Sequence, residues 1–297
     1  SKANPNSRFS ASVNLGSSNY FRESLNQINT PNFLNNSLNS SVSFSKTFRG
    51  YPSVNMSLSA SHSQNTRSNS VNLVLPTFQG SVERIYPFVK RSGQKKGILK
   101  NINMQYNFRG ENRVTTTDSL FLKKEMFDDA KYGMRHSIPI STNFKVLKHL
   151  SVSMNGNYEE VWTGSTIKRN DYDSETGNSE NKVEIKGFDR FSQYNFGMGV
   201  GTTIYGLFNF KKESKIEALR HVIRPSINYS IRPSFDEYYD TYIIDANGNT
   251  AEYTRFEDNF FGLPSRTYSS SIGLQVSNNL EAKVRSKDSL AQESKKI

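Results

Sequence analysis

Hydrophobic and polar residues alternate along much of this chain. Between residues 38 and 48, Leu38, Val42, Phe44 and Phe48 share one parity, and serines occupy the other. Successive side chains of a β-strand point to opposite faces of the sheet, so this period of two predicts strands with one apolar and one polar face. The segments that show the pattern are residues 9–15, 38–48, 54–61, 71–75, 102–108, 150–158, 196–204, 223–232, 268–276 and 280–284.

Helical periodicity is nearly absent from the chain. Residues 211–220 show a weak helical pattern, and no segment has the long apolar stripe of an amphipathic helix. We therefore predict an all-β protein, formed as an antiparallel meander of about 11 long strands.

The predicted connections between strands fall into two length classes. The long ones lie near residues 17–36, 109–131, 164–187 and 234–265, and the shorter ones near residues 50–52, 146–149, 206–218 and 277–279. Residues 65–68 and 86–97 break this order, the first as a short turn and the second as a long connection. Alternate connections of a meander lie on the same side of the sheet, and this asymmetry is typical of a large outer-membrane β-barrel with long external loops.

The residue types on the two faces of such strands indicate what each face meets. A soluble sandwich or β-solenoid would also show the alternation, but its exposed face would carry more Lys and Glu than Ser, Asn and Gly. We therefore expect the polar parity to face a wet lumen and the apolar parity to face lipid. The aromatic residues that we expect at strand ends, as interfacial girdles, are Phe48, Tyr51, Tyr86, Phe88, Tyr158, Trp162, Tyr205 and Tyr268.

One segment gives a specific face assignment. Ile223, Ile227 and Ile231 are predicted to face lipid, because a shift by one residue would put two arginines into the membrane at about 2–4 kcal/mol each near its midplane. The predicted lumen-facing polar residues are Arg224, Ser226, Asn228, Ser230 and Arg232. The two arginines are candidates for contact with a phosphate group.

The composition of the chain limits the kinds of site and partner to be expected. The 297 residues include 20 Phe and 15 Tyr but no Cys, which excludes disulfides and thiolate metal sites. The net charge of +11 favours an anionic partner such as nucleic acid, phospholipid or a phosphorylated glycolipid. The lysine and arginine clusters fall in connections rather than on an aromatic platform, so we do not expect nucleic-acid binding.

Candidate catalytic and ligand sites are weak. The four histidines lack metal spacing, and they are interpreted as strand or turn residues. Gly197, Gly199 and Gly201 lack the third glycine position and the following helix of a nucleotide loop, so we interpret them as strand glycines that permit a bend or the close approach of a plug. The neighbouring carboxylates Glu159 and Glu160, expected beside a loop, should point to opposite faces.

The chain is therefore expected to have no catalytic, cofactor or metal site and not to be an enzyme. A Ser-His outer-membrane lipase remains the enzymatic alternative, because serines and histidines occur on the predicted strands.

Residues 220–235, which read RHVIRPSINYSIRPSF, resemble a strand motif of the LptD family of outer-membrane lipopolysaccharide-assembly proteins, also called organic-solvent-tolerance proteins. The resemblance is to the Bacteroidetes-type members. Further stretches that resemble the family are residues 40–44, 73–76, 84–88 and 278–285.

The resemblance implies a periplasmic jellyroll followed by a very large barrel that a lipoprotein, LptE, plugs. It also implies that lipopolysaccharide arrives along a periplasmic Lpt bridge and leaves through a seam between the first and last strands. On this basis we expect the wall of the translocon that inserts lipopolysaccharide into the outer leaflet of a Gram-negative outer membrane. The expected partners are lipopolysaccharide, outer-membrane lipids, an LptE-like plug and the bridge. A generic porin or ligand-transporter barrel is the alternative.

The resemblance covers barrel strands and no jellyroll. We therefore expect residues 1–297 to be one partial barrel domain, truncated at both ends and without a second domain. An odd number of antiparallel strands cannot close on itself, so we expect an open curved sheet with residues 9–15 and 280–284 at its edges.

Overall fold

In a computed structural model of the chain, the structure describes residues 5–14, 16, 37–90, 93, 97–175, 177, 182–211, 214–284 and 295–296. The predicted loop at residues 17–36 and Leu15 of the first predicted strand lie outside these ranges.

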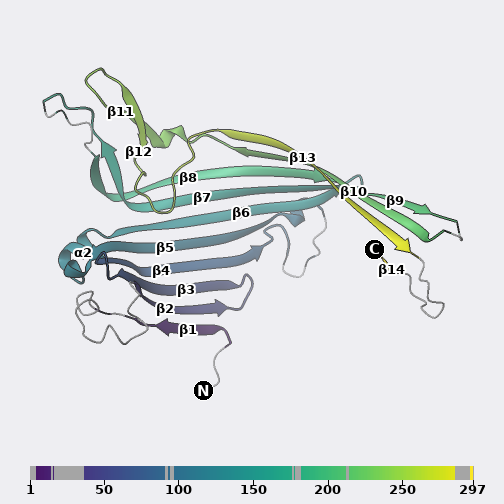
Figure 1. The fold of residues 1–297 in the computed structure, drawn as a ribbon, viewed down its shortest axis with the longest axis horizontal. Coiled ribbons are helices and arrows are strands. Elements are labelled where there is room, and N and C mark those ends of the chain that lie inside the picture. The colour runs from purple at the N-terminus through teal and green to yellow at the C-terminus, as the bar shows by residue number, and fades with distance from the viewer. Residues whose placement is uncertain are drawn as a thin grey trace.

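The described residues form one large antiparallel sheet and a separate hairpin (Figure 1). The large sheet contains β1 (Ser7–Ser12), β2 (Ser37–Phe48), β3 (Val54–Asn65), β4 (Ser70–Ile85), β5 (Asn103–Thr117), β6 (Lys131–Val146), β7 (Leu150–Arg169), β8 (Lys182–Gly201), β9 (Ile204–Asn209), β10 (Ile216–Arg232), β13 (Ser269–Val284) and β14 (Lys295–Lys296). The hairpin pairs β11 (Tyr239–Ile243) with β12 (Thr250–Thr254).

Helices are short. The α-helix α2 spans Lys124–Asp128, and single 3-10 turns span Leu99–Asn101, Asp118–Leu120 and Asp236–Tyr238. None of the helices in the described ranges has the length and apolar character needed to cross a membrane.

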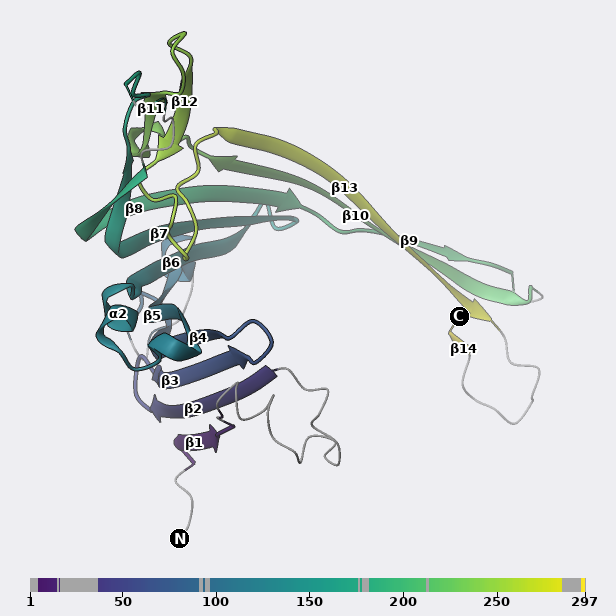
Figure 2. The same cartoon turned by 60° about the vertical axis from the view of Figure 1, so that its left-hand side comes forward.

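The strands follow one another in sequence order across the sheet. Each strand from β1 to β8 pairs with the next, β10 follows β8, and β9 continues the line of β8 beside β10. Figures 1 and 2 show a curved sheet whose ends, β1 and β13 with β14, stay apart. The predictions of an all-β fold, an antiparallel meander of about 11 strands and an open sheet are confirmed.

Several predicted connections are shorter than expected. The loop predicted at residues 109–131 begins only after Thr117, and the one predicted at residues 164–187 spans residues 170–181. The connection predicted at residues 206–218 shrinks to residues 210–215, and residues 216–220 are strand rather than weak helix. In each case the backbone pairing between strands continues beyond the residues whose alternation predicted the strand.

The prediction of a turn at residues 277–279 is wrong. These residues lie inside β13, opposite Val222, Ile223 and Arg224 of β10. The side chains of His221 and Asn278 also form a hydrogen bond of 3.3 Å across the two strands. The strands predicted at residues 268–276 and 280–284 therefore form one continuous strand, which begins at Ser269.

The strand register separates two faces, which we name the polar face and the apolar face. Ser45, Ser57, Gln79, Arg109 and Arg135 form one row across β2 to β6 on the polar face. The neighbouring row on the apolar face begins with Phe44, Leu58 and Phe78.

The apolar face is largely uncovered by the described residues. On β13 the side chains of Ile272 and Leu274 are 73% and 77% exposed. A sandwich or solenoid buries this face against a second layer, so the exposure fits a sheet that meets lipid.

Two small cores hold the loops against the sheet. Met126 of α2 packs on Val71, Leu73 and Val114 near the ends of β4 and β5. The second core, on the polar face, joins Val161 and Phe191 to Phe256 of the connection between β10 and β13. The barrel strands thus carry packed loops at the end that bears the long connections.

The predicted girdle aromatics do not all lie at strand ends. Phe48 ends β2, and Tyr86 directly follows β4. Tyr205 is the second residue of β9, whereas Tyr158 and Trp162 lie within β7, which extends past them to Arg169.

Candidate functional site

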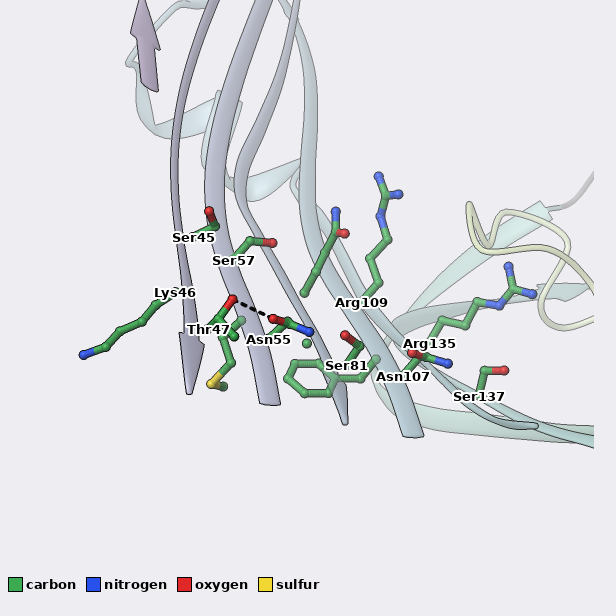
Figure 3. A pocket seen from close by; sticks show the side chains of 14 residues that line it. Ser45, Lys46, Thr47, Asn55, Ser57, Ser81, Asn107, Arg109, Arg135 and Ser137 are labelled. Atoms are coloured by element: carbon green, nitrogen blue, oxygen red, sulfur yellow. Dashed lines mark hydrogen bonds between the residues drawn. The ribbon is translucent and has the colours of Figure 1, made fainter. Parts of the chain in front are cut away.

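A candidate site lies on the polar face of β2 to β6. Side chains from these strands line an open pocket of about 520 Å³, shown in Figure 3. The lining residues of polar-face parity are Ser45, Thr47, Asn55, Ser57, Gln79, Ser81, Asn107, Arg109, Arg135 and Ser137, and Lys46, which has the other parity, lies at the rim. Small hydroxyl and amide side chains recur at every second residue along these strands, so the surface is polar, and the longer arginine side chains extend above it.

Two buried carboxylates hold the arginines of this face. The Glu111 side chain is 1% exposed and forms ion pairs with Arg109 and with Arg113, whose Nε lies 2.7 Å from Oε2. Arg135 pairs with Glu159 at 2.5 Å, and the Gln193 amide donates to the same carboxylate.

The three arginine side chains, those of Arg109, Arg113 and Arg135, remain 43–53% exposed. Guanidinium groups fixed by buried carboxylates are suited to contact a phosphate, because part of each planar fork stays accessible.

The five predicted lumen-facing residues share one face of β10. Ser226, Asn228 and Ser230 lie opposite Gly201, Gly199 and Gly197 of β8, which continue the polar face. Arg224 and Arg232 have the same parity, and Ile223, Ile227 and Ile231 lie on the apolar face.

Two of these five residues line a pocket. Ser226 and Asn228 line a second open pocket of about 610 Å³ together with Ser153 and Gly199. Arg224 and Arg232 lie outside the lining of that pocket, and Ser230 hydrogen-bonds Ser271 at 2.8 Å. Which compartment this face meets stays a prediction.

The strand glycines have a local role. A Cβ at Gly197 would lie 2.9 Å from Oδ1 of Asn155, and one at Gly199 would lie 2.7 Å from Oδ1 of Asn228. Amide side chains from the neighbouring strands occupy the space above both glycines. The glycines therefore let the polar groups of β7 and β10 lie close over β8.

The sequence did not indicate that the β10–β13 loop, residues 233–268, returns over the polar face. Phe191 and Phe256 pack with ring centroids 4.9 Å apart, and the backbone N–H of Ile167 donates to the Arg255 carbonyl at 2.9 Å. The N–H of Ser265 donates to the Gln193 side chain at 3.1 Å. The loop therefore covers part of the polar face of β7 and β8.

Ion pairs surround this contact. Arg169 binds Glu257 at 2.6 Å, and Lys182 and Lys131 both reach Asp258, at 2.5 and 3.4 Å. The Arg169 hydrogen bond holds the pKa of Glu257 below its ordinary value. Burial raises the pKa of Asp258, but the Lys182 and Lys131 ammonium groups outweigh burial and hold it below its ordinary value. Both carboxylates are thus charged near neutral pH.

The remaining sequence predictions concern isolated groups. His62, His136 and His221 lie in strands and His149 in a turn, as interpreted from the sequence. Within the described residues, His, Asp and Glu side chains form no group that could hold a metal ion. Glu159 and Glu160 point to opposite faces as predicted, but they lie within β7 rather than beside a loop.

A single sheet of long antiparallel strands with one polar face and one exposed apolar face is typical of the wall of an outer-membrane β-barrel. A family model described as LptD protein matches residues 1–297, so this chain belongs to the LptD family. LptD proteins are outer-membrane proteins of lipopolysaccharide assembly, and their role is transport rather than catalysis. Membership of this family therefore does not support the alternative of a Ser-His lipase. No curated protein and no solved structure matches the chain.

Proposed function

We propose that residues 1–297 form part of the barrel wall of the translocon that inserts lipopolysaccharide into the outer leaflet. Family membership supports a role in lipopolysaccharide assembly. The observation that carries the proposal is the polar face, whose arginines stand on buried carboxylates beside a pocket of about 520 Å³. In this role the polar face lines a hydrated lumen and shields the sugar and phosphate part of the amphiphile from lipid.

The open edges of the sheet support the proposal that this wall is part of a larger barrel. Among the described residues β1 pairs only with β2, and β13 pairs with β10 along one side and with β14 at Lys283 and Val284 alone. Unpaired backbone groups in lipid cost several kcal/mol each, so both edges need partner strands. We infer that further strands complete the barrel.

The partners follow from the same proposal. They are lipopolysaccharide, outer-membrane lipids, an LptE-like lipoprotein plug and the periplasmic Lpt bridge reached through a jellyroll domain. The resemblance of residues 220–235 to the Bacteroidetes-type members supports the proposal of a translocon of that type. The +11 net charge suits the phosphorylated cargo.

Depletion of the full-length protein tests the function. We expect newly made lipopolysaccharide to disappear from the surface of intact cells, measured with a membrane-impermeant label. Unchanged surface lipopolysaccharide together with lost uptake of small solutes would instead support a porin. Complementation with Arg109→Gln and Arg135→Gln combined should restore less surface lipopolysaccharide than complementation with Arg67→Gln, which removes a charge from the turn between β3 and β4.

A further inference from the structure

Aromatic rings cross the apolar face in a continuous ladder. The ladder runs over five neighbouring strands, β4 to β8, which lie side by side in Figure 1. Successive ring centroids are between 4.3 and 6.0 Å apart. In order across the strands, the rings are those of Phe78, Phe108, Tyr106, His136, Trp162 and Phe188.

A carboxylate on the same face organises one end of the ladder. The Glu160 side chain is only 14% exposed and accepts three hydrogen bonds. The donors are the Trp162 indole N–H at 2.7 Å, the Tyr158 hydroxyl at 2.8 Å and the Arg190 guanidinium at 2.7 Å. These contacts hold the indole and the guanidinium side by side before any ligand arrives.

The charged pair marks an edge of the apolar band. On β7, every apolar-face residue from Leu150 to Tyr158 is uncharged, a stretch of about 27 Å along the strand at ~3.4 Å per residue. This length is comparable with the ~25 Å lipid-facing band of outer-membrane barrels. Glu160 and Arg190 follow immediately, on the side of the long connections. A charge pair is costly in hydrocarbon, so the lipid boundary lies at this pair.

The Arg190 guanidinium remains available at this boundary. Its side chain is 64% exposed, and it donates to Glu160 through Nη1. Long connections of outer-membrane barrels are external, so the boundary faces the outer leaflet. An amphiphile lying along the apolar band therefore places its headgroup against Arg190 and Trp162.

We propose that Tyr158, Glu160, Trp162 and Arg190 form a binding site for the headgroup of a phosphorylated glycolipid in the outer leaflet. The guanidinium contacts a phosphate, the indole lies against a sugar, and the apolar band below takes the acyl chains. The choice of a glycolipid rests on the proposed function. The site itself lies on the opposite face of the sheet from the lumenal arginines, so binding here and transport are separable.

Trp162 is the only tryptophan among the 297 residues and supplies the readout. The full-length protein and its Trp162→Phe variant would be reconstituted in phosphatidylcholine vesicles, and the difference between their emission spectra isolates Trp162. Bromine placed near the headgroup should quench this emission more than bromine near the chain ends. Stronger quenching by the deep label, or none by either, would overturn the boundary.

Lipid A, the phosphorylated glycolipid part of lipopolysaccharide, tests the ligand. Increasing lipid A should shift Trp162 emission to saturation, and dephosphorylated lipid A should require several times more. Arg190→Gln should raise the half-saturating fraction about tenfold, as expected for one lost charge-assisted contact. Arg190→Lys should retain most of the binding, because it keeps the positive charge. This variant therefore separates the loss of the charge from misfolding as the cause of weaker binding.

Lys46→Gln is the matched control, because it removes a cation on the apolar face near the opposite strand ends, beside the Phe48 ring. Equal responses to lipid A with and without phosphate, or equal losses in Lys46→Gln and Arg190→Gln, would refute the site. These results do not depend on transport, so they remain distinct from the depletion experiment.

Discussion

Phe191 of β8 and Phe256 of the β10–β13 loop are each 1% exposed and pack against one another at 4.9 Å. Val161 of β7 completes the contact, and Tyr238 and Phe261 pack around it. This apolar contact lies on the polar face, and it places a connecting loop over the surface that we propose as the lumen wall. The loop therefore narrows access to that surface from the side of the long connections.

Removal of the Phe256 ring should release the loop. Phe256→Ala deletes a buried aromatic ring, a change that typically costs about 3–5 kcal/mol. Because β11, β12 and the loop contact the sheet through this core, we expect loosening of residues 233–268 with little change in the strands. Limited proteolysis of the protein in detergent should show faster cleavage within those residues.

Leu263→Ala is the control for this change, because Leu263 is in the same loop but 45% exposed. Its cleavage rate should match that of the unaltered protein. If Phe256→Ala is cleaved no faster than Leu263→Ala, the core does not hold the loop.

Acid should loosen the same loop. The pKa values of Glu257 and Asp258 are lowered in the folded protein from ordinary values of 4.5 and 3.8. A lowered carboxyl pKa contributes stability that is complete above the ordinary value and is lost as pH falls through the folded value. The loop should therefore remain docked from about pH 8 to about pH 5 and loosen below about pH 4.

The mobility of a spin label attached at Leu263→Cys measures how firmly the loop is docked at each pH. Both ion pairs are partly exposed, so each contributes about 1 kcal/mol or less. Glu257→Gln should reduce the acid-induced change, since Arg169 then has no carboxylate to lose. A mobility change centred near pH 7 would show that protonation of Glu257 and Asp258 does not release the loop.

The strand pattern was predictable where one parity of a strand is apolar and the other is polar. In β10, alternation between isoleucines and polar residues gave the two faces that the strand register separates, because each parity keeps one character over the whole stretch. The pattern failed in β13 at Asn278 and Asn279, which have turn-like character but remain paired with β10. There the backbone ladder, rather than the side chains, decides the structure.

The loop and the aromatic ladder could not be predicted in the same way. Phe256 meets Phe191, and Trp162 meets His136, only because the sheet brings separate strands and a loop together. The local signal was limited to phenylalanines in a connection that was otherwise expected to be polar. The position of Trp162 within β7 was missed, because β7 continues beyond the apolar band to Arg169.

The face assignment of β10 can be tested by cysteine scanning, since the chain has no cysteine of its own. In the assembled protein in intact outer membranes, a small water-soluble thiol reagent should label cysteines on the polar face and spare those on the apolar face. The polar-face positions are Arg224, Ser226, Asn228, Ser230 and Arg232, and the apolar-face positions are Ile223, Ile227 and Ile231. The reverse labelling pattern would place the lumen on the other side of the sheet.

Gly133 should not tolerate a side chain. A Cβ at this position of β6 would lie 2.8 Å from the backbone carbonyl oxygen of Trp162 and 3.5 Å from the rings of Phe260 and Phe261. A backbone atom of a paired strand cannot move aside as a flexible side chain can, so Gly133→Ala should destabilise the protein by about 1–3 kcal/mol.

Gly273→Ala in β13 adds the same methyl group where no atom lies within 4 Å, and it should be close to neutral. Thermal unfolding followed by the heat-dependent gel mobility of the barrel compares the two variants. Equal midpoints for both would show that β6 and β7 are not held as closely as the structure describes.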